Sequence, residues 1–387
     1  VYRSTCSECD YKKKAVLPPG QTVFLDNPLT NGISYYYKTT AFDAMDPPNE
    51  SQFTLTVTGT PFEPPAPVIV KWVTRQPLNQ GRFAHAVHAV GDAIYVFGGD
   101  PGGAGGVLDS IERLDVYAQY ANWNTLAPSG DAFVGRRFFG SVMHDGMFYA
   151  VGGNDGKATI DAMRRFDPTT TKWLDVPTSG FTPVEAFSMG RDPATGRFAA
   201  VSGIGLPAKI QLFDPSSSKW IVSSAGDLSN RYRAGLAVSG ADIFFFGGSQ
   251  TILNSPIAFT SEFVGIEDRW YPRTNMPKAI DSPAGANLDY RVYSIGGDAG
   301  AGAVTDVYEY DPADRTWVPR TSLPSPRRDA RAVELAKKIY VTGGRDGVAA
   351  ALSDVVEGKP LDAAPGNNKV DLTWGFDDGT YAIVSYT

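Results

Sequence analysis

Cysteine and histidine are scarce in this chain. Its 387 residues include two cysteines, Cys6 and Cys9, and three histidines, His85, His88 and His144. A structural zinc site takes four Cys or His ligands, and a disulfide framework takes several cysteine pairs. The sequence therefore predicts neither, and we expect no resident metal or cofactor.

Two further absences narrow the range of functions. No stretch approaches the roughly 20 consecutive apolar residues that a transmembrane helix needs. Acidic residues outnumber basic ones by 42 to 35, which gives a net charge of −7, so the chain lacks the positive field that holds phosphate backbones. We expect neither a membrane span nor a nucleic-acid partner.

Glycine, proline and aromatic residues are plentiful instead. The chain has 41 Gly and 28 Pro, and 12% of its residues are Phe, Trp or Tyr. Segments with a helical period are few, whereas short alternating segments bounded by Gly, Pro and Asn are common, which favours antiparallel strands joined by turns. The expected fold class is all-β.

A repeat runs through most of the chain. Apolar strands end in double glycines, with a degenerate Ser202-Gly203 in the third repeat; the pairs are Gly98-Gly99, Gly152-Gly153, Gly247-Gly248, Gly296-Gly297 and Gly343-Gly344. Tryptophans follow in phase, 47 or 50 residues apart, at Trp123, Trp173, Trp220, Trp270 and Trp317. This period and these motifs resemble those of kelch repeats.

The resemblance implies a six-bladed kelch β-propeller over residues 68–358, similar to the central domain of galactose oxidase. Its sixth blade has three strands of its own and no tryptophan strand after them. The segment 68–78, VIVKWVTRQPL with Trp72, has the form of a fourth strand. We expect it to pair with the third strand of that blade and so close the ring, which would remove the open sheet edges.

The two ends of the chain resemble pieces of one fibronectin type III module. Residues 1–60 contain LTNGISY, in which Tyr35 would be the corner tyrosine of strand F, and residues 369–387 contain VDLTW, in which Trp374 would be the buried tryptophan. Proline-rich and glycine-rich linkers at 61–67 and 359–368 separate these pieces from the propeller. The expected second domain is therefore a split β-sandwich.

The order of the pieces predicts a junction between copies. Written end to start, Ser385, Tyr386 and Thr387 run into Val1, Tyr2 and Arg3 as one alternating strand C. We expect strand C to cross from one unit to the next, as one period of a covalent repeat. Two alternatives stay open: separate subunits that donate a strand to each other, and a single chain that folds its own two ends together.

Few residues suggest chemistry. Cys6 and Cys9 are expected to form a local loop disulfide, with free thiols or half a metal site as alternatives. The three histidines fit ordinary strand and turn positions. Acidic residues after glycine pairs, Asp100, Asp155 and Asp298, lack calcium-loop spacing. The copper-radical chemistry of galactose oxidase needs a cysteine inside its propeller, and this propeller has none.

Arginines gather where repeats begin, and in kelch propellers such positions border one mouth of the channel. The candidate binding residues are Arg82, Arg137, Arg231, Arg233 and Arg328. These arginines have two possible roles: they form a pocket for an anionic sugar, or they form ion pairs with Asp or Glu of adjacent blades. No catalytic residue is identified, although Glu185 is a carboxylate at this mouth.

The sequence thus predicts an extracellular or cell-surface structural protein. Its expected partners are copies of itself, arranged head to tail in a filament or stalk, and a surface polysaccharide. The alternatives are a secreted carbohydrate-binding propeller and a sugar mutarotase or epimerase, all argued by analogy of fold.

Overall fold

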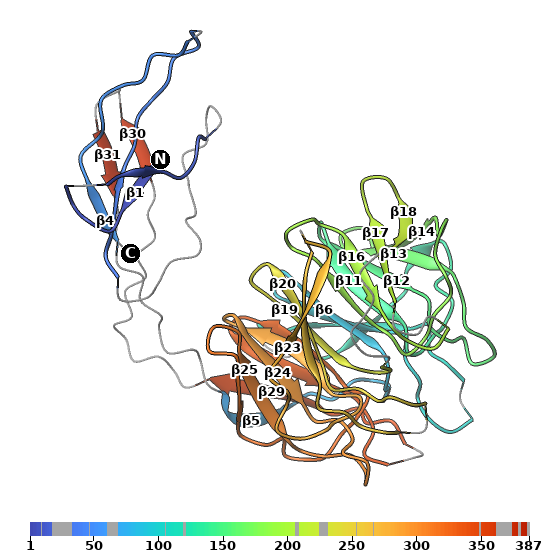
Figure 1. The fold of residues 1–387 in the computed structure, drawn as a ribbon. Helices are drawn as coiled ribbons and strands as arrows, with labels where there is room; N and C mark the ends of the chain where they lie inside the picture. Colours follow the sequence, from blue (N-terminus) through green and yellow to red (C-terminus); the bar gives the residue numbers. More distant parts are fainter. Residues whose placement is uncertain are drawn as a thin grey trace. The chain divides into compact units, whose positions relative to one another are not determined.

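The computed structural model of the chain is built from strands (Figure 1). It describes residues 1–8, 10–17, 33–45, 47–59, 69–104, 106–118, 121–205, 209–223, 231–252, 254–265, 267–347 and 350–360, and the backbone of 374–377 and 381–384. Within these residues no helix has the length and apolarity to span a membrane. The chain divides into two compact units, Pro67–Leu361 and Val1–Ala66 with Asp362–Thr387. Both divisions fall within the linkers expected at 61–67 and 359–368.

The larger unit contains six sheets among its described residues, each with four antiparallel strands in meander order. The first three sheets are β6 (Ala86–Val90), β7 (Ala93–Phe97), β8 (Ile111–Asp115) and β9 (Asn124–Leu126); β11 (Gly140–His144), β12 (Met147–Val151), β13 (Met163–Asp167) and β14 (Lys172–Val176); and β15 (Ser188–Arg191), β16 (Phe198–Val201), β17 (Ile210–Asp214) and β18 (Lys219–Val222). The short strand β10 (Ser129–Gly130) adds to β14 in parallel.

The other three sheets follow the same order. They are β19 (Gly235–Ser239), β20 (Asp242–Phe246), β21 (Thr260–Val264) and β22 (Arg269–Arg273); β23 (Ala284–Leu288), β24 (Arg291–Ile295), β25 (Val307–Asp311) and β26 (Thr316–Pro319); and β27 (Arg331–Leu335), β28 (Lys338–Thr342), β29 (Val355–Pro360) and β5 (Ile69–Arg75). The strand β5 pairs with β29 in antiparallel register, Arg75 opposite Val355. The sixth sheet thus takes its last strand from the start of the unit, as expected for residues 68–78.

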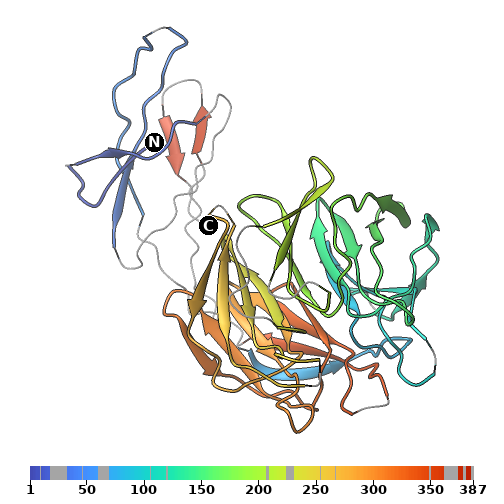
Figure 2. The same cartoon turned by 45° about the vertical axis from the view of Figure 1, so that its right-hand side comes forward.

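The sheets are arranged around an axis (Figure 2), and the first strands of the sheets lie innermost, since they contact one another. These inner strands, β6, β11, β15, β19, β23 and β27, contact one another in a closed cycle, because β27 also contacts β6. Apolar clusters fill the space between each pair of neighbouring sheets. The core is therefore divided into layers between sheets, and burial of apolar surface there holds the ring together.

Each repeated tryptophan packs against the preceding sheet. Trp173 of the second sheet stacks on Phe133 with ring centroids 4.5 Å apart and contacts Phe97 of the first. Trp123 and Trp317 donate their indole N–H groups to the backbone carbonyls of Gln76 and Thr274. The equivalents Trp220, Trp270 and, partly buried, Trp72 occupy the same layers. The Trp period therefore marks the spacing of the sheets.

Backbone hydrogen bonds join the six repeats at one end of the channel. Just before each inner strand, one N–H donates to the carbonyl of its equivalent in the preceding repeat, over 2.8–3.3 Å. The six residues, which we call the mouth ring, are Ala84, Phe138, Ala186, Arg233, Ser282 and Asp329. All have φ between +50° and +55°. The bond from Ala84 to Asp329 joins the first repeat to the sixth, so the ring of bonds is closed.

The double glycines make a second set of contacts between repeats. The amide of Gly344 donates to the carbonyl of Arg82 over 2.9 Å, and a Cβ on Gly343 would lie 2.2 Å from the same oxygen. The other four pairs repeat this arrangement with the next sheet. Glycine is required here because a neighbouring backbone occupies the place of a side chain.

The smaller unit has a four-stranded sheet in the order β2-β1-β3-β4. Its strands are β2 (Lys12–Lys13), β1 (Tyr2–Ser4), β3 (Tyr35–Lys38) and β4 (Val57–Gly59). Tyr35 is buried, and the guanidinium of Arg3 lies 5.0 Å from the centre of its ring. The pairing of β1 with β3 makes the expected strand C and strand F neighbours.

The C-terminal strands pair differently from the expectation. β30 (Trp374–Asp377) and β31 (Tyr381–Val384) form a hairpin, with Trp374 opposite Val384. Strands B and C of a fibronectin type III module lie in opposite sheets, so this pairing does not fit that assignment. The intervening sequence contains Asp378-Gly379, a strong hairpin-turn signal. Ser385, Tyr386 and Thr387 lie outside the described residues, and only the backbone of Trp374 is described.

Candidate functional site

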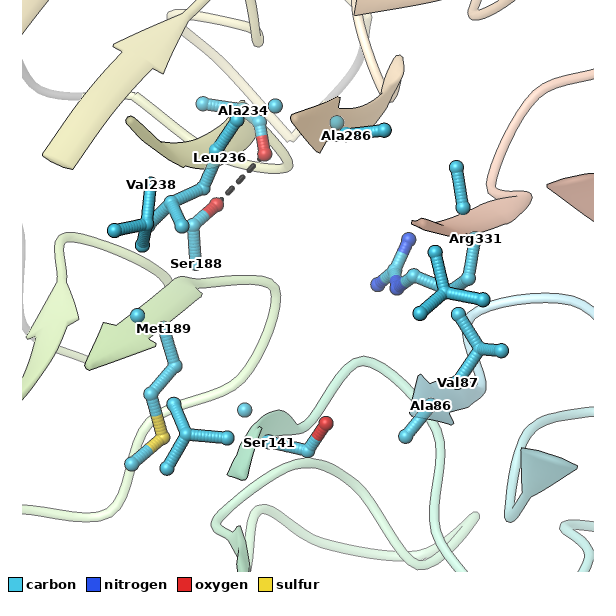
Figure 3. Close-up of a pocket in the computed structure, with 18 of the residues that line it drawn as sticks. Ala86, Val87, Ser141, Ser188, Met189, Ala234, Leu236, Val238, Ala286 and Arg331 are labelled. Atoms are coloured by element: carbon cyan, nitrogen blue, oxygen red, sulfur yellow. Dashed lines mark hydrogen bonds between the residues drawn. The ribbon is translucent and has the colours of Figure 1, made fainter. Parts of the chain in front are cut away.

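A cavity of about 540 Å³ runs between the six inner strands of the larger unit. Every repeat contributes residues to its wall, from the mouth ring at one end to residues such as His88, Asn287 and Glu334 at the other. Figure 3 shows side chains of different inner strands directed into this space. The wall combines apolar side chains with hydroxyl, amide and charged groups.

Four arginines at repeat starts are fully buried and do not face the cavity. They are Arg82, Arg136, Arg231 and Arg327. The Nη1 of Arg82 donates to the carbonyl of Gly98 over 2.8 Å, and its Nη2 lies 2.5 Å from Glu112 Oε1. Arg231 donates to the carbonyls of Phe245 and Phe259 over 3.3 and 3.1 Å. Each of the four guanidinium groups thus braces the backbone of its own sheet.

This placement corrects the expectation for Arg82 and Arg231. Both were candidate mouth residues, yet their side chains are 0% and 1% exposed. They stand two positions before the mouth ring, where the side chain turns between strands rather than toward the channel. Val184 and Ile280 fill the equivalent positions of the third and fifth repeats, so the site is a core position.

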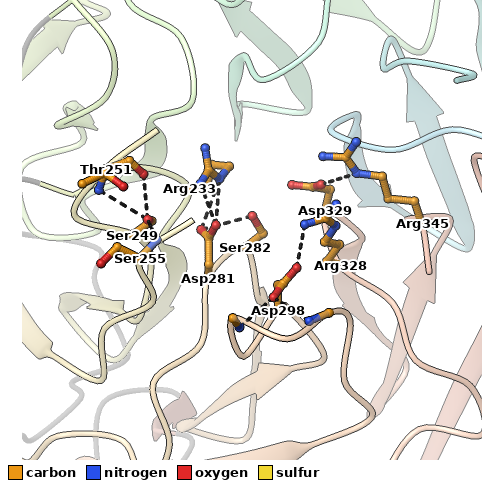
Figure 4. Close-up of polar contacts among 12 residues, drawn as sticks. Arg233, Ser249, Thr251, Ser255, Asp281, Ser282, Asp298, Arg328, Asp329 and Arg345 are labelled. Carbon is orange, nitrogen blue, oxygen red and sulfur yellow. Dashed lines mark hydrogen bonds and ion pairs between the residues drawn. The ribbon is translucent and has the colours of Figure 1, made fainter. Parts of the chain in front are cut away.

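The other three candidates lie at the mouth, and each is paired with an aspartate; Figure 4 shows the pairs of Arg233 and Arg328. Arg233 contacts Asp281 through Nη2 over 2.6 Å, and Arg328 contacts Asp298 over 2.6 Å. Arg137 pairs with Asp100. Each pair joins neighbouring repeats, so these arginines perform the structural pairing that was the second interpretation.

A fourth pair at this mouth is absent from the sequence prediction. Arg345 Nε lies 2.8 Å from Asp329 Oδ2, and Asp329 belongs to the mouth ring. Burial raises the pKa of Asp281, an effect that its bonds to Arg233 oppose. Four ion pairs among the described residues thus lie at this mouth.

The aspartates that follow glycine pairs are also engaged. Asp100 accepts the amide of Gly102, Asp155 those of Lys157 and Ala158, and Asp298 those of Gly300 and Gly302. Among the described residues, no three His, Cys, Asp or Glu side chains gather in a way that could hold a metal ion.

Two histidines line the cavity and are neutral at physiological pH. Burial, with help from nearby Arg331 and Arg82, holds the pKa of His85 well below its usual range. Burial also lowers the pKa of His88 to about 4. His85 Nε2 lies 2.8 Å from Thr342 Oγ1, whereas its buried Nδ1 has no partner among the described residues. His144 accepts a bond from Arg191 Nε over 3.0 Å.

One cavity residue escaped the sequence analysis. Arg331 begins β27, and its guanidinium reaches into the cavity (Figure 3). It stands two residues after the mouth ring, where the other five repeats have Ala86, Gly140, Ser188, Gly235 and Ala284. Aligning the repeats at this position would have identified it.

The remaining candidate residues belong to the smaller unit. Cys6 is disulfide-bonded, and Cys9, its expected partner, lies outside the described residues. The amino group of Val1 donates to the carbonyl of Ala15 over 2.9 Å, and Tyr2 Oη donates to Glu50 over 2.5 Å. These contacts fix the start of the chain within its own sheet.

We predict that Arg82→Ala lowers the free energy of unfolding by about 3–5 kcal/mol, because it leaves Glu112 buried and unpaired. The control is Arg113→Ala, which removes an ion pair to Asp115 from the same sheet with side chains 40% and 39% exposed; we expect a loss below about 1 kcal/mol. Chemical denaturation measures both. Equal losses would contradict the structural role of the buried arginine.

Comparison with known proteins finds similarity to kelch-repeat proteins. Residues 64–190 match the KLHDC2/KLHL20/DRC7 Kelch-repeats domain, and residues 282–324 match the Kelch motif. Kelch-like protein 35 of Mus musculus is 26% identical over 229 residues, and Kelch-like protein 25 of Xenopus tropicalis is 25% identical over 240.

Each of these matches covers 58% of this chain, which spans 36% and 38% of the two relatives. The structure of YjhT aligns with a TM-score of 0.60 at 15% identity, over 72% of this chain and 95% of YjhT, and this likeness concerns the fold alone. Together the sequence motifs, the ring of sheets and these matches support a kelch β-propeller.

Proposed function

We propose that this chain is an extracellular carbohydrate-binding protein, in which a six-bladed kelch propeller holds a sugar in its central channel. The observation that carries the proposal is the cavity of about 540 Å³ between the inner strands. Small-molecule sites usually enclose about 300–1,000 Å³ and combine apolar walls with a few polar groups. The size and lining of this cavity fit that description.

The polar groups of the wall suit hydroxyl-rich ligands. Ser141, Ser188 and Asn287 come from three different inner strands. Such groups donate and accept hydrogen bonds without charge. Together they can bind several hydroxyl groups of one ring from different sides.

A catalytic role, such as sugar mutarotation, has weaker support. General acid–base catalysis needs a carboxylate or histidine that can exchange protons near neutral pH. Among the cavity residues that the structure describes, Asp329 is paired with Arg345, and Glu334 accepts the amide of Lys337. His88, with its pKa of about 4, stays unprotonated. Binding without chemistry is the function that this arrangement favours.

Methyl NMR spectra with a panel of neutral and acidic monosaccharides test the binding proposal. We expect at least one sugar to shift the methyl signals of Val87, Leu236 and Val238, which line the cavity. The exposed methyl groups of Ile221 and Val222 on β18 serve as the control and should not move. Absence of shifts with every sugar, or shifts confined to the control residues, would contradict the proposal.

A head-to-tail assembly is a second candidate function. The observation that favours it is that residues from both ends of the chain form one compact unit. Such a unit can be completed by the two ends of one chain or by ends exchanged between copies. Exchange that does not close into a ring produces filaments. The smaller unit would then couple one copy to the next. The strand order β2-β1-β3-β4 of its N-terminal part supports the sheet C′-C-F-G of a fibronectin type III module.

Light scattering across a range of protein concentrations separates the two arrangements. Exchange between copies predicts masses at multiples of one chain that increase with concentration. A single mass equal to one chain at every concentration would overturn the assembly proposal and leave both ends joined in one molecule.

A further inference from the structure

One repeat differs from the other five at the first residue of its inner strand. Two residues after the mouth ring, five repeats have Ala, Gly or Ser, and the sixth has Arg331. The backbone at this position follows the same course in every repeat, since it lies directly after the closed ring of hydrogen bonds. The arginine is therefore an addition to the cavity wall rather than part of the repeat.

The charge of Arg331 is not matched by a carboxylate. Its Nη1 donates to the carbonyl of Ala330 over 3.0 Å, and no acidic group among the described residues forms an ion pair with it. Burial lowers the pKa of the guanidinium, and the charge of Asp329 opposes that effect. Arginine remains charged near neutral pH, so the cavity contains a poorly solvated cation.

The neighbouring groups leave this cation available. Asp329, two residues earlier, is 2.8 Å from Arg345, and Glu334 accepts the amide of Lys337 over 2.8 Å. His85 is neutral, and Arg331 itself contributes to its lowered pKa. Asp329 is thus already paired and His85 is neutral, so an anion entering the cavity would find a guanidinium without an ion-pair partner among the described residues.

We propose that Arg331 binds the carboxylate of an acidic sugar in the channel, and this inference depends on the binding function proposed above. The planar guanidinium offers two parallel N–H donors that match a carboxylate. Hydrogen bonds to the sugar ring come from Ser141, Ser188 and Asn287. Arg331 then sets the preference for acidic over neutral sugars, and the other groups bind both.

Isothermal titration with matched sugars tests this assignment. The probes are D-glucuronic acid and D-galacturonic acid, and their neutral counterparts D-glucose and D-galactose. We expect at least one acid to bind at least tenfold more tightly than its neutral counterpart, because a hydrogen bond to a charged group contributes about 1.5–3 kcal/mol. Arg331→Ser should abolish that difference and leave neutral-sugar affinity unchanged.

The variants are chosen so that folding does not confuse the result. Serine is tolerated at this position, since the third repeat has Ser188 there. A second variant, Arg331→Lys, retains the charge but loses the paired donors, so we expect an intermediate preference for the acid. Arg113→Ser, on an outer strand, is the control and should bind as the parent does.

The outcomes distinguish the inference from the function on which it depends. If no sugar binds the parent protein, the binding function fails. If sugars bind but Arg331→Ser keeps the preference for acids, or the parent has none, the role of Arg331 is overturned while the binding function stands. Tighter binding of D-glucose 6-phosphate than of either acid, lost in Arg331→Ser, would also overturn the assignment to a carboxylate.

Discussion

Backbone hydrogen bonds between successive repeats are the constraint on which the larger unit depends. The mouth ring joins six residues by six N–H to carbonyl bonds, and glycine amides such as that of Gly344 add a second set to the next repeat. Neither set involves side-chain chemistry, so both tolerate variation in the sequence around them. The φ values of the ring are ones that most residues avoid, and the closed ring holds them.

This constraint explains the division of labour among the arginines. Arginines two positions before the ring, such as Arg82, turn into the sheet and donate hydrogen bonds to carbonyls there. Arg233, a residue of the ring, instead forms an ion pair with Asp281 of the next repeat. Two positions after the ring of the sixth repeat, the guanidinium of Arg331 reaches into the channel.

Much of the architecture could be predicted because its signals are periodic. Double glycines, in-phase tryptophans and the unpaired segment with Trp72 indicate the sheets and the closing strand directly.

The direction of single side chains could not be predicted in the same way. Arg231 and Arg233 both start one repeat, yet one is buried and one lies at the mouth, since the left-handed φ of the ring residue sets which way each side chain turns. The resemblance predicts strands in opposite sheets at the C-terminal end, whereas Trp374–Asp377 and Tyr381–Val384 pair as a hairpin, as the Asp378-Gly379 turn signal between them favours. Arg331 was overlooked because it lies inside a strand and matches no motif.

The most direct test of the closed ring compares two glycines with the same backbone conformation. Gly343 and Gly91 both have φ of +56°, but a Cβ on Gly343 would lie 2.2 Å from the carbonyl oxygen of Arg82, whereas a Cβ on Gly91 meets nothing within 4 Å. The free energy of unfolding of Gly91→Ala should fall by about 1–2 kcal/mol, the cost of the left-handed conformation alone. That of Gly343→Ala should fall clearly further, because the sixth and first sheets must move apart at the point where the ring closes. Equal losses for the two variants would contradict a ring held together by close backbone contact between repeats.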